Sequence, residues 1–459
     1  MITDTIAAIS TSTMSNAGIG IVRISGDEAI SIADKIFVSN TPNKTLKNVK
    51  SHTINYGKIV ENGKYIDEVL VSVMKAPNTY TKEDIVEINC HGGILVVQKI
   101  LSLVIESGAR IAEPGEFTKR AFLNGRMDLS QAEAVMELIH SKNEFALKSS
   151  MSSLRGDFSN KINEIREQVI NNIAYIEAAL DDPEHISLEG FLEELGENVD
   201  KYIQTVEKLL ATADNGRILK EGISTVILGK PNAGKSSLLN ALSGVERAIV
   251  TDIEGTTRDT LEEQINLDGI VLNLIDTAGI RETQDIVEKI GVQKAKDYAQ
   301  TADLIIYVVD ASTKLDDNDL EIIDIIKDKK TIVLLNKSDL EAKITMEDIK
   351  EHINCKTVSI SAKNLEGIDD LSDTIKKMFL KGEVSFDDEI YVANVRQKTS
   401  LQEALKSFKM VKTSIENCMP EDFLSIDLMN AYAELGKIVG QSVEEDLVNE
   451  IFSKFCMGK

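Results

Sequence analysis

The chain has 459 residues and a mass of 50.5 kDa, with 42% apolar and 27% charged side chains, which is typical of a soluble globular protein with several domains. Its four cysteines form no CxxC pair, and no stretch approaches 18 uninterrupted apolar residues. We therefore expect no disulfide framework, structural zinc site or membrane span, and a cytoplasmic location. The net charge of −24 disfavours tight nucleic-acid binding by the chain alone.

The first third of the chain has the pattern of a mixed domain. Short β-branched runs at residues 20–26, 68–74 and 84–89 alternate with turn signals, and a helical pattern covers 94–106. We predict an α+β domain over residues 1–120.

Long amphipathic patterns follow. Apolar residues recur every three or four positions over 129–152 and 158–180, which predicts two helices, and Pro183 ends the second. A further helix over 188–213 leads to Asn215 and Gly216, which we interpret as the exit into the next domain. Helical periodicity resumes after Lys381.

The charge distribution connects these helical segments. Residues 121–216 and 382–459 together carry 16 basic and 32 acidic side chains, whereas residues 1–120 carry 13 of each. The shared acidic composition predicts one discontinuous all-α domain that residues 217–381 interrupt.

The interrupting segment has a different pattern. Continuous apolar runs at 225–228, 271–275, 304–309 and 331–335 are separated by helical stretches. Buried parallel strands have this composition, so we predict a doubly wound α/β domain over 217–381.

The first apolar run is followed by a phosphate-binding motif. Residues 229–236 read GKPNAGKS, which matches GxxxxGK[ST]. The glycines let backbone N–H groups face a phosphate, Lys235 can neutralise its oxygens, and the Ser236 hydroxyl can bind Mg²⁺. Because the motif lies between a predicted strand and a predicted helix, we predict a P-loop.

Three further motifs follow in a fixed order. Residues 276–279 read DTAG, 336–339 read NKSD and 361–363 read SAK. Asp276 can hold a Mg²⁺-bound water, and Asp339 can accept from both N1–H and N2–H of guanine, which adenine does not offer. The ligand is therefore predicted to be GTP, and the ordered set resembles the translation-factor-related GTPases.

The residues that could assist hydrolysis are less certain from pattern alone. Residues 255–259, GTTRD, lie in the position of switch I, where Thr257 by resemblance binds Mg²⁺; a polar loop is the alternative. Many small GTPases place a glutamine after the DxxG glycine, but this chain has Ile280. Another charge must assist, and Arg281, Glu282, Asp285 and Glu288 are the candidates.

Taken with Asn232 and Arg281, six segments resemble the MnmE or TrmE family of tRNA-modification GTPases. They are the P-loop, GTTRD and DTAG, together with CHGG at 90–93, PGEFT at 114–118 and CMGK at 456–459. The resemblance implies a folate-binding-like α+β domain, a helical domain and an inserted Ras-like G domain. It also implies a homodimer.

The implied activity needs partners. The family resemblance implies GTP hydrolysis coupled to modification of C5 of the wobble uridine, position 34, of certain tRNAs to an aminomethyl-type group. A flavoprotein of the MnmG (GidA) type would join in a heterotetrameric or larger complex, which would bind the tRNA. No membrane is implied.

The resemblance also assigns the nucleotide site. K⁺ would be held by Asn232 and by carbonyls of Thr251, Ile253 and Thr256 when two G domains associate, and Mg²⁺ by Ser236 and Thr257. Glu288 would orient the attacking water; Arg281 would assist or form a simple salt bridge. The GTP-binding set comprises Asn232, Ala233, Gly234, Lys235, Ser236, Ser237, Thr251, Asp252, Ile253, Glu254, Gly255, Thr256, Thr257, Asp276, Thr277, Ala278, Gly279, Asn336, Lys337, Asp339, Ser361, Ala362 and Lys363.

For 5-formyl-tetrahydrofolate or a related folate, the matching positions are Arg23, Glu87, Arg126 and Lys459. A carboxylate can face the pteridine N–H groups, and basic side chains suit the glutamyl tail or the formyl oxygen. Arg126 stands where the family has lysine. The alternative for Arg23 and Glu87 is a cross-strand ion pair. Cys456 is a catalytic candidate beside Lys459, or an inert thiol.

Two other functions remain open at this point. A GTP-gated scaffold for ribosome assembly would share Asn232 and the GTTRD segment, but would not bind folate. A folate-dependent one-carbon enzyme with a regulatory G domain would form product without the flavoprotein.

Overall fold

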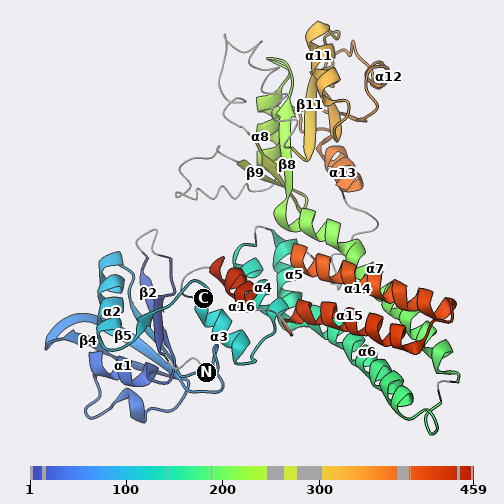
Figure 1. The fold of residues 1–459 in the computed structure, drawn as a ribbon. Helices are drawn as coiled ribbons and strands as arrows, with labels where there is room; N and C mark the ends of the chain where they lie inside the picture. The colour runs from blue at the N-terminus through green and yellow to red at the C-terminus, as the bar shows by residue number, and fades with distance from the viewer. Residues whose placement is uncertain are drawn as a thin grey trace. The chain divides into compact units, whose positions relative to one another are not determined.

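The computed structural model describes residues 4–12, 17–141, 143–187, 189–245, 263–275, 302–379, 392, 394–441, 445–455 and 458. The chain forms two compact units (Figure 1). The first contains Met1–Ile139, Met151–Val199 and Lys406–Lys459, and the second contains His140–Ser150 and Asp200–Leu405. Within the described ranges, no helix is both long enough and apolar enough to cross a membrane.

The first unit is built around a seven-stranded sheet in the order β3-β4-β5-β6-β2-β1-β7. Its neighbouring strands are antiparallel except for β1 and β7. The strands are β1 (Ile6–Ile9), β2 (Ile19–Ser25), β3 (Phe37–Ser39), β4 (Thr53–Glu61), β5 (Lys64–Met74), β6 (Ile85–His91) and β7 (Arg110–Ile111). The three strand patterns expected in this region are confirmed as parts of β2, β5 and β6.

Alternation along the strands gives the sheet two different faces. Val22, Ile24, Val86 and Ile88 belong to the core under helices α1 (Ala29–Ile36) and α2 (Ile94–Glu106), which cover one face (Figure 1). Side chains of a strand alternate between faces, so the paired Arg23 and Glu87 lie on the other face. A short 3₁₀ helix, η1 (Leu46–Asn48), follows β3 in the chain.

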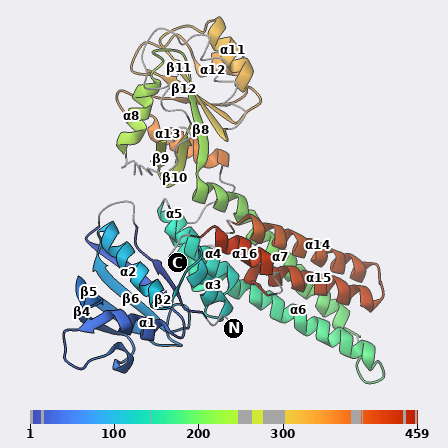
Figure 2. The same cartoon turned by 60° about the vertical axis from the view of Figure 1, so that its left-hand side comes forward.

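Helices make up the rest of the first unit. Helices α6 and α15 lie side by side (Figures 1 and 2) because the buried stripe of α15, which includes Leu424, Leu428 and Leu435, packs on α6. Helices α5, α7 and α14 each have residues in both units. The bounds are α3 (Glu116–Leu123), α4 (Leu129–Ile139), α5 (Glu144–Arg155), α6 (Asp157–Asp181), α7 (Phe191–Glu221), α14 (Val395–Glu416), α15 (Glu421–Val439) and α16 (Glu445–Ser453).

Two helix predictions were wrong in their limits. The single helix expected over 129–152 is two helices, α4 and α5, because the Asn143 side chain accepts from the Ala146 N–H at 2.7 Å and begins a new helix. The helix expected to end at Ala213 continues to Glu221, so Asn215 and Gly216 are helical. The chain turns instead at Gly222, where φ is +84° and a Cβ atom would lie 2.6 Å from the Val271 carbonyl oxygen.

The second unit contains the predicted doubly wound α/β fold. Its six-stranded sheet has the order β13-β12-β11-β8-β10-β9, with β9 antiparallel and the others parallel. Helices α8 and α13 pack on one face, while α11 and α12 pack on the other (Figure 2). The bounds are β8 (Ile223–Leu228), α8 (Lys235–Val245), β9 (Glu263–Leu267), β10 (Ile270–Leu274), β11 (Leu304–Asp310), α11 (Asp317–Ile326), β12 (Thr331–Asn336), α12 (Met346–Lys350), β13 (Lys356–Ser359) and α13 (Ile368–Phe379).

Candidate functional site

The predicted P-loop connects β8 to α8 at the carboxyl end of the parallel strands, where ligands of doubly wound sheets bind. Two glycines allow its path. A Cβ atom on Gly229 would lie 2.4 Å from the Val308 carbonyl oxygen, and one on Gly234 would lie 2.0 Å from Nδ2 of Asn336. Any side chain at either position would therefore displace the loop.

Lys235 lies at the first position of α8 with its ammonium turned back into the loop. Its Nζ donates to the carbonyl oxygens of Gly229 at 2.7 Å and Lys230 at 2.8 Å. Burial lowers the pKa of Lys235 below its ordinary value. A cation held inside a glycine-containing loop gives the loop affinity for phosphate.

Asn336 connects three of the predicted motifs. Its buried side chain donates from Nδ2 to the Ala233 carbonyl oxygen at 2.9 Å and accepts at Oδ1 from the Ala362 N–H at 3.1 Å. One amide thus joins the P-loop, the NKSD segment at the end of β12 and the SAK segment that follows β13. The sequence predicted that these segments share a site, but not that Asn336 would connect them.

The neighbouring Asp339 is oriented by the SAK segment. Ser361 Oγ donates to Asp339 Oδ1 at 2.8 Å, and the Ser338 N–H donates to the Ile360 carbonyl oxygen at 3.1 Å. A carboxylate fixed by one donor keeps further lone pairs for a ligand. This geometry suits a partner with two adjacent N–H groups.

Lys337 lies against the end of β11. Its Nζ is 2.5 Å from Oδ2 of Asp310. Burial works to raise the pKa of Asp310, but Lys337 and the Ser312 donors together hold this pKa below its ordinary value. Asp310 therefore remains charged and fixes Lys337 beside the P-loop end of the sheet.

Several predicted residues lie outside the described residues. The structure places Asn232, Ala233, Gly234, Ser236 and Ser237 in the P-loop and the start of α8, and Lys363 in the SAK segment. Outside the described ranges lie Thr251, Asp252, Ile253, Glu254, Gly255, Thr256, Thr257, Asp276, Thr277, Ala278, Gly279, Arg281, Glu288, Cys456 and Lys459.

A second cluster lies on the uncovered face of the first unit's sheet. Arg23 on β2 is directly opposite Glu87 on β6, and Arg23 Nε donates to Glu87 Oε1 at 2.8 Å. The two side chains are 17% and 22% exposed. The cross-strand ion pair that the sequence left open is therefore present, and both groups remain partly accessible.

Aromatic rings join this pair to Arg126. The Arg126 guanidinium lies 4.7 Å from the Tyr80 ring centroid, and the Arg23 guanidinium lies 5.8 Å from the same centroid. Arg23 also lies 5.7 Å from the ring of Phe117. Phe117 belongs to the PGEFT segment that the sequence singled out, whereas no sequence pattern indicated Tyr80.

The C-terminal tail is bound at the same cluster. The Gly458 carbonyl oxygen accepts from Ser10 Oγ at 3.1 Å and from Arg23 Nη1 at 3.3 Å. Gly458 has φ of +86°, and a Cβ atom there would lie 2.3 Å from the Ile9 carbonyl oxygen. The glycine of the CMGK segment is thus required for this close approach.

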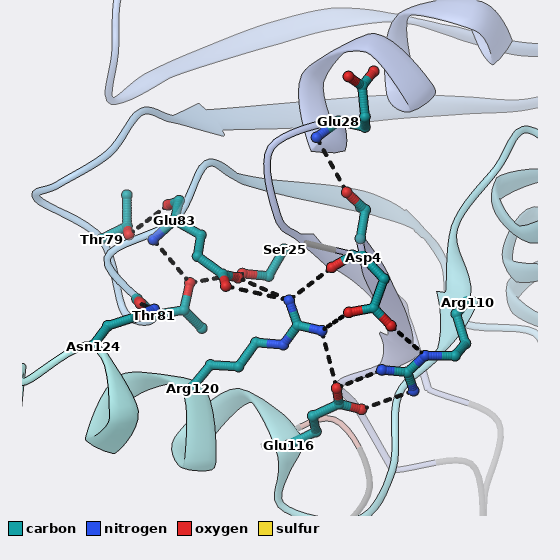
Figure 3. A network of polar contacts seen from close by, with 11 residues as sticks. Asp4, Ser25, Glu28, Thr79, Thr81, Glu83, Arg110, Glu116, Arg120 and Asn124 are labelled. Atoms are coloured by element: carbon teal, nitrogen blue, oxygen red, sulfur yellow. Dashed lines mark hydrogen bonds and ion pairs between the residues drawn. The ribbon is translucent and has the colours of Figure 1, made fainter. Parts of the chain in front are cut away.

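A buried ionic network supports the same region. Arg120 on α3 is 1% exposed and donates to Asp4 Oδ1 at 2.9 Å, to Glu83 Oε1 at 3.2 Å and to Glu116 Oε1 at 3.0 Å (Figure 3). Glu116, the glutamate of the PGEFT segment, also accepts from Arg110. The network joins the N-terminal segment, the segment before β6 and α3.

Comparisons with known proteins agree over the whole chain. The model described as GTP-binding protein TrmE N-terminus matches residues 5–126, and the model described as MnmE helical domain matches residues 129–456. The chain is 60% identical over 459 residues to the tRNA modification GTPase MnmE of Lachnoclostridium phytofermentans, covering 100% of both chains. It is 50% identical over 461 residues to that of Alkaliphilus oremlandii, again covering 100% of both.

Among solved structures, the G domain of the T. maritima FeoB iron transporter is similar to 34% of this chain and 97% of that one. The two are 27% identical, with a TM-score of 0.26.

Proposed function

Because this chain belongs to the MnmE family of tRNA modification GTPases, we propose that it hydrolyses GTP to drive modification of C5 of the wobble uridine at position 34 of certain tRNAs. The product carries an aminomethyl-type group. The observation that supports this proposal best is the Asn336 side chain, which joins the P-loop to both predicted guanine-binding segments. The reaction requires a flavoprotein partner of the MnmG type, which brings the tRNA into a heterotetrameric or larger complex with the homodimer.

The guanine specificity follows from hydrogen-bond chemistry. Asp339, held by Ser361, accepts from N1–H and N2–H of guanine. Adenine would leave this carboxylate unpaired, which costs far more than a lost contact in water. Lys235 and the P-loop N–H groups bind the phosphates, and Ser236 with Thr257 holds Mg²⁺.

A K⁺ ion fits the donor groups that this chain offers. Asn232 is exposed on the P-loop with φ of +63°, so its amide oxygen can join carbonyls of Thr251, Ile253 and Thr256. Such uncharged oxygen ligands suit a weakly hydrated monovalent cation. When bound, the ion offsets charge that builds between the β- and γ-phosphates. Association of two G domains completes this site, and Glu288 orients the water.

A reduced folate fits the cluster on the first unit's sheet. Glu87 supplies a carboxylate for ring N–H groups, while Arg23, Arg126 and Lys459 supply cations for the formyl or glutamyl oxygens. Tyr80 and Phe117 add aromatic surface within 6 Å of the Arg23 guanidinium, which suits the flat, partly apolar bodies that such pockets bind. The folate supplies the one-carbon unit when bound.

Substituting Glu87→Gln is expected to weaken binding of 5-formyl-tetrahydrofolate by roughly ten- to a hundredfold, the value of a hydrogen bond to a charged acceptor. Glutamine keeps an oxygen for the Arg23 Nε donor, so the sheet is preserved. Isothermal titration measures the affinity, and nucleoside analysis of tRNA from cells with only this variant is expected to lack the modification at position 34.

The matched control is Glu61→Gln, which removes a carboxylate of another pair on the same sheet, 2.5 Å from Lys99. It is expected to bind folate and support modification as the wild type does. If the wild-type chain binds no folate and position 34 is unchanged when the gene is deleted, a GTP-gated ribosome-assembly scaffold replaces this proposal.

A further inference from the structure

The P-loop is attached to a neighbouring helix by a side chain that none of its motifs specifies. Lys230 follows Gly229, and its Nζ lies 2.8 Å from Asp316 Oδ2 and 2.6 Å from Asp319 Oδ2. Both carboxylates belong to the capping box at the start of α11. The Lys230 side chain is 24% exposed, that of Asp316 is 55% exposed, and that of Asp319 is 2% exposed.

Asp319 is bound on all sides by protein donors. Its Oδ1 accepts from the Tyr307 hydroxyl at 2.7 Å, and its Oδ2 accepts from the Asp316 N–H at 3.1 Å as well as from Lys230. Burial, with the nearby Asp319 charge, raises the pKa of Tyr307, so the phenol remains a donor. A buried carboxylate needs such partners, because removing one leaves a charge without compensation.

Tyr307 extends the connection into the sheet. It is fully buried on β11, which pairs with β8, the strand that leads into the P-loop. The path from Lys230 through Asp319 to Tyr307 therefore joins the loop to both α11 and β11. Like the strands and helix it connects, it lies wholly within the second unit.

The backbone of Lys230 binds the phosphate-binding lysine. The Lys230 carbonyl oxygen accepts from Lys235 Nζ at 2.8 Å and from the Ala233 N–H at 3.3 Å. The far end of the loop is held separately, by the Asn336 amide at the Ala233 carbonyl oxygen. Side-chain contacts thus fix the loop at two points, and Lys230 supplies the one nearer β8.

We propose that Lys230, Asp319 and Tyr307 form a positioning cluster that fixes the P-loop in its phosphate-binding conformation before the nucleotide arrives. None of the three needs to touch the reacting phosphate. A loop that is already ordered loses less conformational entropy when the ligand binds, so the cluster strengthens nucleotide binding. This inference rests on the nucleotide site of the proposed function and adds residues outside its predicted GTP-binding set.

The test is the variant Lys230→Met, which removes the charge and keeps the aliphatic stem. The dissociation constant for GDP is expected to rise about tenfold and the KM for GTP by a similar factor, with kcat falling less than threefold. Lys230→Arg, whose guanidinium can bind both carboxylates, is expected to return the GDP affinity to within threefold of wild type. The matched control Lys327→Met removes an exposed ion pair at the other end of α11 and is expected to change nothing.

The outcomes separate three cases. If Lys230→Met melts at a lower temperature but binds GDP within twofold of wild type, the cluster only stabilises α11 and the proposal is overturned. If that variant does not fold, Tyr307→Phe decides: GDP binding about threefold weaker supports the proposal, and unchanged binding overturns it. Failure of the wild-type chain to bind GDP would instead overturn the nucleotide site itself.

Discussion

Substituting Asp339→Asn is expected to lower the affinity for GTP roughly a thousandfold, equivalent to about 4 kcal/mol. The carboxylate accepts two guanine N–H groups, whereas an asparagine amide presents an N–H₂ group toward the guanine amino group. Xanthosine triphosphate carries an oxygen at that position, so the variant is expected to bind it better than GTP. Competition of each nucleotide against a fluorescent GDP analogue measures both affinities.

The control for this substitution is Asp324→Asn, an exposed carboxylate on α11 that pairs with Lys327. Its affinity for GTP is expected to equal that of wild type. Retention of tight GTP binding by Asp339→Asn would show that guanine is recognised elsewhere. Ser361→Ala, which removes the donor that orients Asp339, is expected to have a smaller effect in the same direction.

Substituting Arg120→Met is expected to destabilise the first unit by roughly 3–5 kcal/mol. The guanidinium is 1% exposed, and its removal leaves Asp4, Glu83 and Glu116 without their shared cation. Lys99→Met removes a partly exposed pair on the same unit and is expected to cost under about 1 kcal/mol. Urea unfolding followed by hydrogen exchange in β1, β6 and α3 measures the difference. An Arg120→Met protein as stable as Lys99→Met would contradict the assigned role of the network.

The same network predicts a dependence on pH. The hydrogen bond from Arg110, aided by the Arg120 charge, lowers the pKa of Asp4 below its ordinary 3.8. Burial works to raise the pKa of Glu116, but Arg110, the Glu113 N–H and Arg120 outweigh it and hold this pKa below 4.5. Their stabilisation is present above these ordinary values and is lost as the pH falls through the lowered values. Unfolding measured from pH 5 downward is expected to show a smaller loss for Arg120→Met than for wild type.

The sequence predicted the architecture of both units because their patterns are local. Continuous apolar runs predicted β8, β10, β11 and β12, and the motifs that follow these strands predicted that their residues converge. Where the prediction was wrong, one local group outweighed the period: Asn143 begins a second helix inside an unbroken apolar pattern. The continuation of α7 through Gly216 shows the converse, since helical neighbours outweighed an Asn-Gly turn signal.

The connections between motifs were not predictable in the same way. Asn336 and Ala233 are 103 residues apart, and Lys230 and Asp316 are 86 residues apart. No periodicity or short motif encodes such pairs, and Tyr80 gains its place beside Arg23 and Arg126 only when the chain folds. The sequence indicated the types of group at each site, and the fold shows which of them meet.

The measurement that tests the account most directly is GTP hydrolysis in K⁺ and in Na⁺ at equal ionic strength. We expect hydrolysis to be at least roughly tenfold faster in K⁺, and Asn232→Ala to lose most of this difference. Because Asn232 has φ of +63°, Asn232→Gly separates loss of the amide oxygen from backbone strain, and it is expected to behave as the alanine variant does. Equal rates in both salts, or undiminished K⁺ stimulation in Asn232→Gly, would contradict hydrolysis assisted by a bound monovalent cation.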